Sequence, residues 1–292
     1  MRVVVTGAGG QLGAVLVHEF QSGHEVIAFS HRDLDIADDA AVADAIDRVR
    51  PNLIVNAAAF TDVDASEDRP VEAFNANAFG VRALARAARR QQATLIHYST
   101  DFVFDGTGSR PYVEMDRPNP RSVYAMSKLL GEWFAMDAPH AYVLRVESLF
   151  GGVPGGPPAR GSVETILNTL KNGGSPRVFI DRTVTPTYAI DAAQATRRLI
   201  ELQAPPGLYH CVNSGSCTWF EFARELATQL GIEARLTPVR MNEVKFRAAR
   251  PLYCALSNAK LQSLGIQMAS WQAALSRFIA TIRVLNDRAD TT

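Results

Sequence analysis

The sequence predicts an α/β protein: a Rossmann-type, doubly wound parallel sheet with a smaller C-terminal lobe that is expected to bind substrate. Three observations support this fold class. Short runs rich in Val and Ile alternate with helix-forming stretches through the first half of the chain, as expected of strands that are buried on both faces. A glycine-rich turn directly follows the first of these runs. A segment rich in Gly and Pro at 151–158 separates this half from a less regular remainder.

Strands and helices are expected to alternate up to about residue 150. The dinucleotide-binding domain is therefore assigned to 1–150, with segments near 177–212 returning to its sheet, and 151–292 is assigned mostly to the substrate-binding lobe. In the first half, the expected strands are 3–6, 25–29, 53–56, 94–99 and 141–146, and the expected helices are 11–21, 38–50, 70–91 and 124–136. In the second half, the expected helices are 163–172, 189–202, 219–230 and a last one from 271, and the expected strands are 177–180 and 208–212.

The composition narrows the class of protein. Thirty basic and thirty acidic side chains cancel, so no overall field attracts nucleic acid or a membrane surface. The three cysteines (Cys211, Cys217 and Cys254) lack the number and spacing of a disulfide framework or a zinc site. The chain begins directly with an apolar strand, without the pattern of a signal peptide, and has no apolar run long enough for a membrane span. We therefore expect a cytoplasmic protein with no nucleic-acid or membrane partner.

The turn after the first strand, Gly7-x-x-Gly10-x-x-Gly13, has the glycines of a dinucleotide-binding loop. Gly7 permits a tight turn, Gly10 lets the backbone approach a pyrophosphate, and Gly13 lets the next helix pack closely on the sheet. Backbone N–H groups at the start of that helix would face the phosphates. A plain strand–turn–helix also uses glycines for packing, but the position of this turn after an N-terminal Val run favours a dinucleotide.

The end of the second strand bears on the choice between NAD and NADP. A carboxylate there binds the ribose 2′-hydroxyl of NAD, whereas an arginine accommodates the 2′-phosphate of NADP. Ser30 and Arg32 offer hydrogen bonds and positive charge, so NADPH is the favoured cofactor, while the nearby Asp33 keeps NADH possible. Asp35 and Ile36 are expected to flank the adenine.

A Tyr–Lys pair supplies a candidate proton donor. Tyr124 and Lys128 are four residues apart and therefore lie on one face of the expected helix 124–136. A phenol has an ordinary pKa of about 10, so it becomes a useful acid when a nearby ammonium stabilises the phenolate. Thr100, after the expected strand 94–99, is placed to hydrogen-bond both the phenol and a substrate carbonyl. Most Tyr-x-x-x-Lys pairs are surface pairs, but the glycine turn makes this one a catalytic candidate.

Together these features resemble the extended short-chain dehydrogenase/reductases, and within them the dTDP-4-dehydrorhamnose reductase family, over nearly the whole chain. The resemblance implies a catalytic triad of Thr100, Tyr124 and Lys128. The segments that carry it are Asn56–Asp64, His97–Phe104, Tyr124–Glu132, Gly207–His210, Thr218-Trp219, Arg250-Pro251 and Ser257–Leu261. The residues that it places against the cofactor are Gly7, Gly10, Gln11, Leu12, Gly13, Ala57, Ala58, Ala59 and Ser99, together with Tyr124 and Lys128.

The chemistry implied by this resemblance is reduction of the C4 ketone of a nucleotide-linked deoxysugar. Hydride reaches the carbonyl carbon from the nicotinamide, Tyr124 protonates the oxygen, and Thr100 holds that oxygen in place. Arg250 is a suitable partner for the diphosphate of the substrate. The residues expected around the substrate are Val63, Thr100, Asp101, Phe102, Phe104, Ser148 and Arg250.

The chain departs from the family where the sugar ring is expected. Phe102 stands where the family usually has tyrosine and Ser148 where it usually has tryptophan, so the identity of the sugar stays open. Glu147 has two interpretations, contact with sugar hydroxyls or closure of an ion pair. Some family members dimerise around magnesium through a glutamate early in the first helix, where this chain has Gly13-Ala14-Val15-Leu16. We therefore expect no metal, and a homodimer is possible.

Two other functions stay open at this point. A cofactor-binding regulatory subunit would keep the glycine turn, but it has no need of the complete set Thr100, Tyr124 and Lys128. A nucleotide-sugar epimerase would share both features and would retain its cofactor through purification. A dehydratase is disfavoured because Asp101 is followed by Phe102 rather than by a second acid.

Overall fold

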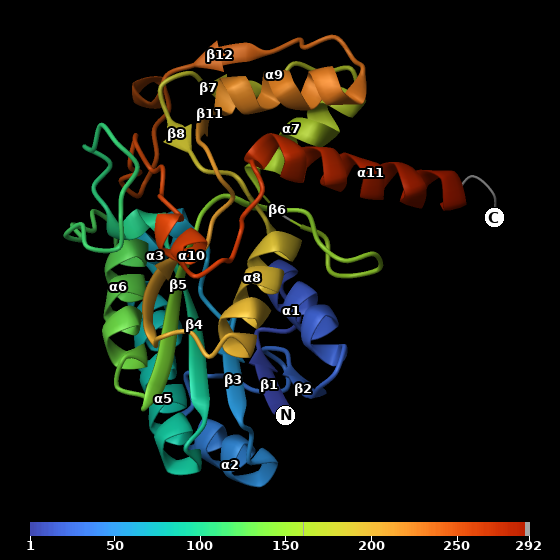
Figure 1. Cartoon of the computed structure of the whole chain (residues 1–292). Coiled ribbons are helices and arrows are strands. Elements are labelled where there is room, and N and C mark those ends of the chain that lie inside the picture. The colour runs from blue at the N-terminus through green and yellow to red at the C-terminus, as the bar shows by residue number, and fades with distance from the viewer. Residues whose placement is uncertain (160, 290–292) are drawn as a thin grey trace.

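A parallel sheet of six strands forms the centre of the computed structural model, which describes residues 1–159 and 161–289 (Figure 1). The strand order is β10-β5-β4-β3-β1-β2, so the chain reverses direction across the sheet between β1 and β3. This arrangement confirms the predicted doubly wound α/β fold, in which ligands bind beyond the carboxyl ends of the strands near the point of reversal. The strands are β1 (Arg2–Thr6), β2 (Glu25–Phe29), β3 (Leu53–Asn56), β4 (Thr94–Thr100), β5 (His140–Val146) and β10 (Gly207–His210).

Helices cover both faces of this sheet (Figure 1). Alternate residues along each strand point to opposite faces: Val3 and Val5 pack in the core under α1 and α8, and Val4 packs in the core under α2, α5 and α6. Continuous burial on both faces is the physical reason that these strands read as uninterrupted apolar runs. The helices are α1 (Gln11–Gln21), α2 (Asp39–Val49), α5 (Gly80–Gln91), α6 (Val123–Ala135) and α8 (Ala189–Glu201).

The segment before β4 differs from the single helix expected at 70–91. A π-helical turn interrupts it where Asn77 makes tertiary contacts: the side-chain Nδ2 donates to the carbonyl of Phe60 at 3.0 Å and to Oγ of Ser127 at 3.0 Å. Helix α6 also approaches closely, because a Cβ on Gly131 would lie 2.1 Å from the Asn77 carbonyl oxygen. Such contacts override local helix propensity. The elements are α3 (Val63–Asp68), α4 (Pro70–Phe74), the π turn η1 (Asn75–Phe79) and α5.

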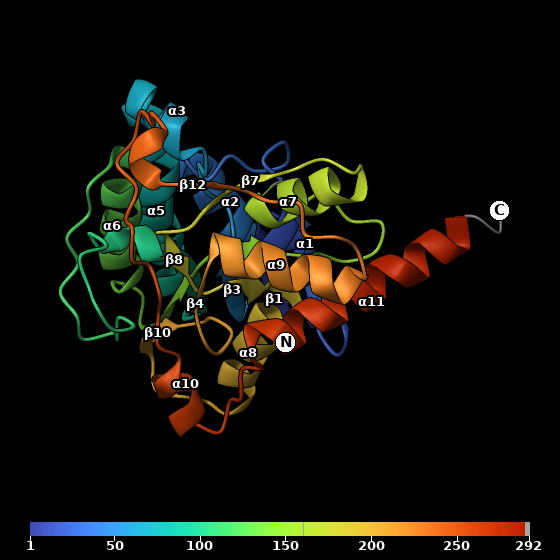
Figure 2. The ribbon, with the colours of Figure 1, turned by 90° about the horizontal axis from the view of Figure 1, so that it is seen from above.

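The second half of the chain builds a lobe over the carboxyl ends of the strands (Figures 1 and 2). Its core is aromatic: Phe222 contacts Phe150, Trp219 and Trp271 with ring centroids 5.6–6.0 Å apart. None of the helices formed by the described residues is both long and apolar enough to cross a membrane. The helical elements are η2 (Asp101–Val103), α7 (Ser162–Lys171), α9 (Trp219–Leu230), η3 (Met241–Glu243), α10 (Ala259–Ser263) and α11 (Trp271–Ala289).

Short strand pairs complete the lobe. Within 177–212, only α8 and β10 pack with the main sheet, whereas β7 pairs with β12. The pairing of β7 depends on a segment about sixty residues later in the chain, which local sequence patterns cannot show. The pairs are β6 (Leu149–Phe150) with β9 (Thr187–Tyr188), β7 (Arg177–Phe179) with β12 (Thr237–Val239), and β8 (Thr183–Val184) with β11 (Cys217–Thr218).

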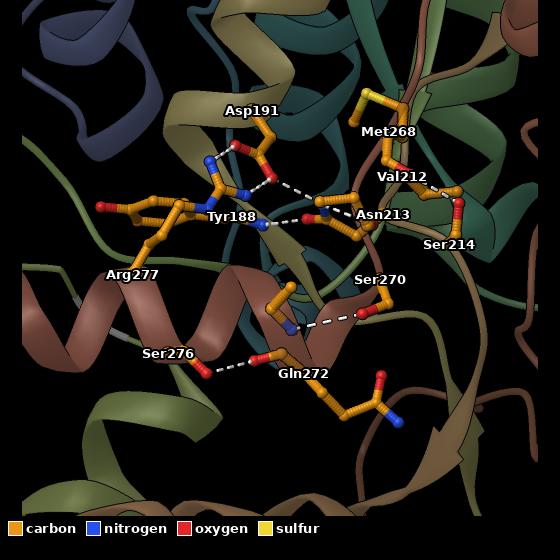
Figure 3. A network of polar contacts seen from close by, with 12 residues as sticks. Tyr188, Asp191, Val212, Asn213, Ser214, Met268, Ser270, Gln272, Ser276 and Arg277 are labelled. Carbon is orange, nitrogen blue, oxygen red and sulfur yellow. Dashed lines mark hydrogen bonds and ion pairs between the residues drawn. The ribbon is translucent and has the colours of Figure 1, made fainter.

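A polar network around a buried carboxylate fastens α11 to α8 and thus to the sheet (Figure 3). Arg277 forms a two-pronged ion pair with Asp191, with Nη1–Oδ1 and Nη2–Oδ2 distances of 2.7 and 2.6 Å. Asn213 donates to the same carboxylate at 2.6 Å and accepts from the backbone N–H of Tyr188 at 2.7 Å. Because the Asp191 side chain is only 7% exposed, it depends on these partners for the solvation that water would otherwise supply.

Replacing Arg277 by methionine should therefore destabilise the protein. Removing the guanidinium leaves the buried Asp191 carboxylate without its main partner, which costs about 2 kcal/mol of unfolding free energy. The matched control is Arg198→Met on α8, whose guanidinium is 55% exposed and pairs with Glu201, and which should cost less than about 1 kcal/mol. Urea unfolding of both variants measures the difference. Equal losses would show that the Asp191 pair does not anchor the helix.

Candidate active site

Steric contacts explain two of the three glycines in the turn after β1. Gly7 has a φ of +72°, and a Cβ there would lie 2.4 Å from the backbone nitrogen of Ala58. A Cβ on Gly13 would lie 2.1 Å from the Gly7 carbonyl oxygen. Gly10 is the N-cap of α1, which has neither a side-chain cap nor an acidic residue in its first turn. The first backbone N–H groups of α1 therefore face outward without a negative charge beside them, which fits a phosphate group.

The predicted cofactor residues Gln11 and Leu12 open helix α1. The amide Nε2 of Gln11 donates to the carbonyl of Gly151 at 2.7 Å, so this side chain joins the glycine turn to the loop after β6. Leu12 is 9% exposed and packs in the core between α1 and the sheet. The side chain of Gln11 therefore lies at the surface of the site. The side chain of Leu12 is in the core, so only its backbone can face the site.

In the tight turn after β2, the carboxylate of Asp33 bonds to Ser30 of the same turn. Asp33 Oδ2 accepts hydrogen bonds from the backbone N–H of Ser30 at 2.8 Å and from its hydroxyl at 2.6 Å. These bonds to Ser30 lower the pKa of Asp33. Arg32 and Asp35 are exposed, and Ile36 is buried. Asp33, the carboxylate that could have bound the ribose of NADH, is thus bonded within the turn. The side chain of Arg32 is exposed.

The small residues Ala57, Ala58 and Ala59 follow β3 in an extended segment held by Asn56. The side-chain oxygen of Asn56 accepts from the Thr6 hydroxyl at 2.7 Å and from the Ala58 backbone N–H at 3.1 Å. Asn56 is 1% exposed, so its role is to fix this segment beside the glycine turn. A polar residue at the end of an otherwise apolar strand is the sequence signal for such a role.

The three predicted catalytic residues meet where β4 ends and α6 begins. Ser122 caps α6 by accepting the backbone N–H of Ala125 at 3.2 Å, which starts the helix two residues before Tyr124. The Lys128 ammonium donates to the carbonyl oxygen of Tyr98 on β4 at 2.5 Å. The Tyr124 phenol lies close enough to the Thr100 side chain for Thr100 to lower its pKa, while the Thr100 hydroxyl donates to Asp101 Oδ1 at 2.9 Å.

Burial, rather than the charge of Lys128, dominates the pKa of the resting Tyr124 phenol. Burial raises the pKa of Tyr124, the charge of Asp101 raises it further, and the hydrogen bond with Thr100 acts in the opposite direction. Burial lowers the pKa of Lys128 to about 8, and the charge of Glu132 opposes that shift. The phenol therefore stays protonated at neutral pH, which is the state that a proton donor requires.

A buried ion pair lies beneath the catalytic group. Arg145 on β5 contacts Glu132 on α6 through Nη2–Oε2 and Nε–Oε1 distances of 2.7 and 2.8 Å. Ser99, predicted to contact cofactor, is 3% exposed and donates its hydroxyl to Glu132 Oε1 at 2.5 Å. The side chain of Ser99 is thus committed to the ion pair. Only the family motif, and no feature of the chemistry, pointed to Glu132.

The predicted substrate residues divide between the site and the core. Phe102 packs edge-on against Tyr124, with ring centroids 5.6 Å apart. Phe104 instead stacks on Tyr112 in a separate core cluster and is 1% exposed, so it faces no open site. Ser148, between β5 and β6, has a left-handed φ of +45° that is uncommon for a residue other than glycine.

Arg250 lines a cavity of about 430 Å³. Val63 does not line it but lies in α3, the helix whose Asp64 binds Arg250. Arg250 lines this cavity together with Phe246 and binds Asp64 Oδ2 through Nη2 at 2.6 Å. Its guanidinium also lies over the Phe246 ring, 4.4 Å from the centroid. Val63 is adjacent to Asp64 at the start of α3. The predicted diphosphate partner is therefore held by a carboxylate with which a phosphate would have to compete.

Comparisons with known proteins agree with this geometry. Residues 1–284 match the family described as RmlD substrate binding domain. The chain is 36% identical to the spore coat polysaccharide biosynthesis protein SpsK of Bacillus subtilis, over 95% of this chain and 96% of that protein. It is 35% identical to a dTDP-4-dehydrorhamnose reductase of Streptomyces griseus, over 94% and 92%. The crystal structure of a Bacillus anthracis dTDP-4-dehydrorhamnose reductase in complex with NADP superposes with a TM-score of 0.90 at 33% identity, over 96% and 99% of the two chains.

The pKa of Lys128 can be measured through protein stability. Its folded value of about 8 lies below the ordinary value of about 10.4, so the unfolded chain binds more protons between these two pH values. Stability contributed by this site therefore rises with pH across that window, by at most about 1.4 kcal/mol per pH unit. Wild type should gain unfolding free energy relative to Lys128→Met from pH 8 to pH 10, measured by urea unfolding. A constant difference would refute the depressed pKa.

Proposed function

The chain belongs to the RmlD substrate binding domain family, and on this premise we propose that it reduces the C4 ketone of a nucleotide-linked deoxysugar with NADPH. The observation that carries the proposal is a protonated Tyr124 phenol beside Thr100, with the buried Lys128 one helical turn further along α6 and bound to the strand that ends at Thr100. It lies at the same edge of the sheet as the glycine turn. The enzyme is accordingly an NAD(P)H-dependent oxidoreductase of the kind its relatives represent.

The residues around the glycine turn fit the cofactor. The uncapped start of α1 would receive the phosphates, and Gly10 offers a backbone without a side chain at the point of approach. Arg32 is exposed at the end of β2, where a 2′-phosphate would lie, which supports NADPH over NADH. NADPH supplies the hydride when bound.

The remaining chemistry belongs to the side chains of this protein. The Tyr124 phenol gives its proton to the developing alkoxide, because it is a protonated O–H group at the start of α6, beside the Thr100 side chain. Thr100 orients both oxygens through its hydroxyl. A positive charge on Lys128 stabilises the phenolate that forms, and this charge is present below a pH of about 8. Positioning and charge stabilisation thus act together.

The two alternative functions receive less support. A regulatory subunit that only binds cofactor has no use for a buried lysine one helical turn from the phenol, held by the Tyr98 carbonyl. An epimerase remains distinguishable by cofactor that stays bound through purification. Two positions expected near the sugar differ from the family: Phe102, which packs against Tyr124, replaces its usual tyrosine, and Ser148, which has a left-handed φ, replaces its usual tryptophan.

Replacing Tyr124 by phenylalanine tests the proton donor. With a freshly generated dTDP-4-keto-6-deoxy-L-sugar, wild type should oxidise NADPH faster than NADH, and Tyr124→Phe should lose at least about a hundredfold in kcat. Tyr142→Phe is the matched control, since its hydroxyl bonds the Ala204 carbonyl far from the triad. Absorbance at the NADPH band reports both rates. A Tyr124 variant that keeps its rate would exclude the phenol as the acid.

We also propose that the protein forms a homodimer in the cytoplasm. Exposed apolar side chains gather on the adjacent elements α4, η1 and α6, and with a formal net charge of zero two copies would not repel each other. The three cysteines are buried free thiols, which is consistent with a reducing compartment. These exposed side chains are Val71, Phe79, Met126, Trp133 and Met136.

Trp133→Lys tests the dimer. Trp133 is 64% exposed on α6, so a lysine there does not disturb the fold but places two charges in the proposed apolar contact. Sedimentation equilibrium should show a dimer for wild type and a monomer for the variant. Met115→Lys is the control, because Met115 is 91% exposed and lies in the loop before α6. A wild-type monomer, or a dimer unaffected by Trp133→Lys, would remove this face as the interface.

A further inference from the structure

The proton donor lies on the first turn of α6, which is the part of a helix that the helix itself constrains least. Tyr124 is the second residue of α6, and the first N–H groups of a helix have no acceptor within it. The ion pair that Glu132 makes with Arg145 fixes α6 further along its length. The position of the phenol therefore also depends on what holds the N–H groups around Tyr124.

Two side chains accept N–H groups on either side of Tyr124. The Ser122 hydroxyl, which caps α6, accepts the N–H of Ala125 at 3.2 Å. The N–H of Val123 donates to Oε1 of Glu67 at 2.9 Å, and Glu67 belongs to a different helix, α3. Since α6 has no acidic residue in its own first turn, Glu67 supplies from outside the carboxylate that stabilises the start of a helix.

The helix that carries Glu67 is itself held in place. At its start, the Asp62 carboxylate caps α3 by accepting the N–H of Ala65 at 2.9 Å. On the side of the lobe, Asp64 Oδ1 accepts the N–H of Ala248 at 3.0 Å, and Asp64 Oδ2 binds Arg250 Nη2 at 2.6 Å. Glu67 therefore reaches α6 from a short helix that is fastened to the lobe.

We propose that Glu67 is a positioning residue for the reduction: by accepting the Val123 N–H, it fixes the first turn of α6 and with it the Tyr124 phenol. The proposal deepens the proposed function and rests on it, because the phenol is there the proton donor. Glu67 acts through the backbone of α6. The property that the site requires of it is an acceptor oxygen at the reach of a glutamate side chain.

Three substitutions separate reach from charge. Glu67→Gln keeps an acceptor oxygen at the same reach without the charge, Glu67→Asp keeps the charge on a side chain one methylene shorter, and Glu67→Ala removes both. With NADPH and the keto sugar, kcat should fall about tenfold or more in the alanine variant and nearly as far in the aspartate variant, but stay within about threefold of wild type in the glutamine variant. The KM for NADPH should change less than about twofold in all three. Recovery by aspartate but not by glutamine would overturn the proposal.

A double-mutant cycle separates positioning from a general loss of structure. If Glu67 acts through the phenol, Glu67→Ala should cost less than about twofold more in kcat when Tyr124 is already phenylalanine, because the group that it positions is gone. A merely structural defect would lower the rate by the same factor in both backgrounds. Equal losses with and without the Tyr124 hydroxyl would therefore overturn the proposal.

The matched control is Asp68→Ala, one residue further along the chain. Asp68 is also an acid of α3, its side chain is 44% exposed, and its partner is Arg247 of the lobe rather than a residue of α6. This variant removes an ion pair from the same helix but leaves the Val123 N–H bound to Glu67, so kcat should stay as in wild type. An equal loss of kcat in Asp68→Ala and Glu67→Ala would count against a specific role of Glu67 and overturn the proposal.

A second measurement does not depend on turnover. In hydrogen–deuterium exchange, the Val123 N–H should exchange about tenfold or more faster in Glu67→Ala than in wild type, and Glu67→Gln and Asp68→Ala should retain its protection. Unchanged protection in Glu67→Ala would overturn the proposal. Failure of the proposed function reads differently, because wild type would then leave NADPH unoxidised with the keto sugar while protection of this N–H still depends on Glu67.

Discussion

The geometry of the active site depends on the buried ion pair between Glu132 and Arg145. Their side chains are 7% and 2% exposed, and two hydrogen bonds of 2.7 and 2.8 Å join α6 to β5. Breaking such a pair costs about 3–5 kcal/mol, although replacing both partners by apolar groups is often neutral. Its contribution is therefore geometric. Tyr124, Lys128 and Glu132 follow one another at intervals of four, so fixing Glu132 fixes the rotation of the helix that carries the phenol.

The same ion pair sets the electrostatics above it. Glu132 favours the charged form of Lys128 against the cost of burial, and the ammonium in turn lowers the pKa of His97, which burial already lowers. His97 stays neutral and receives a hydrogen bond from Asn56, the residue that fixes the segment after β3. Lysine, histidine and asparagine thus extend one polar layer from the proton donor toward the glycine turn. Apolar side chains in these positions would pack, but they would not stabilise a buried ammonium on α6.

The features of the fold and the site that depend on residues close together in the sequence could be predicted, and those that depend on distant residues could not. The strands of the sheet were predicted because burial on both faces leaves a continuous apolar run, and the Tyr124–Lys128 pair because helical spacing is local. The break at Asn77 was missed, since its cause is a contact with Phe60 and α6 rather than any helix-breaking residue. The core position of Phe104 was missed for a similar reason: a motif fixes its place in the chain, but its stacking on Tyr112 depends on the later loop.

The lobe contributes charged and polar groups to the candidate site at the end of β4. Asp101 and Glu147 belong to the first half of the chain, while Arg182, Thr185 and Cys254 belong to the second. Without the lobe, two buried carboxyls would lie next to Thr100 with neither the guanidinium nor the Thr185 N–H to stabilise a charge. The contacts that the lobe makes with Asp101 and Glu147 therefore also determine the charge behind Thr100. Docking of the lobe and the acidity of the site are for this reason a single property of the fold.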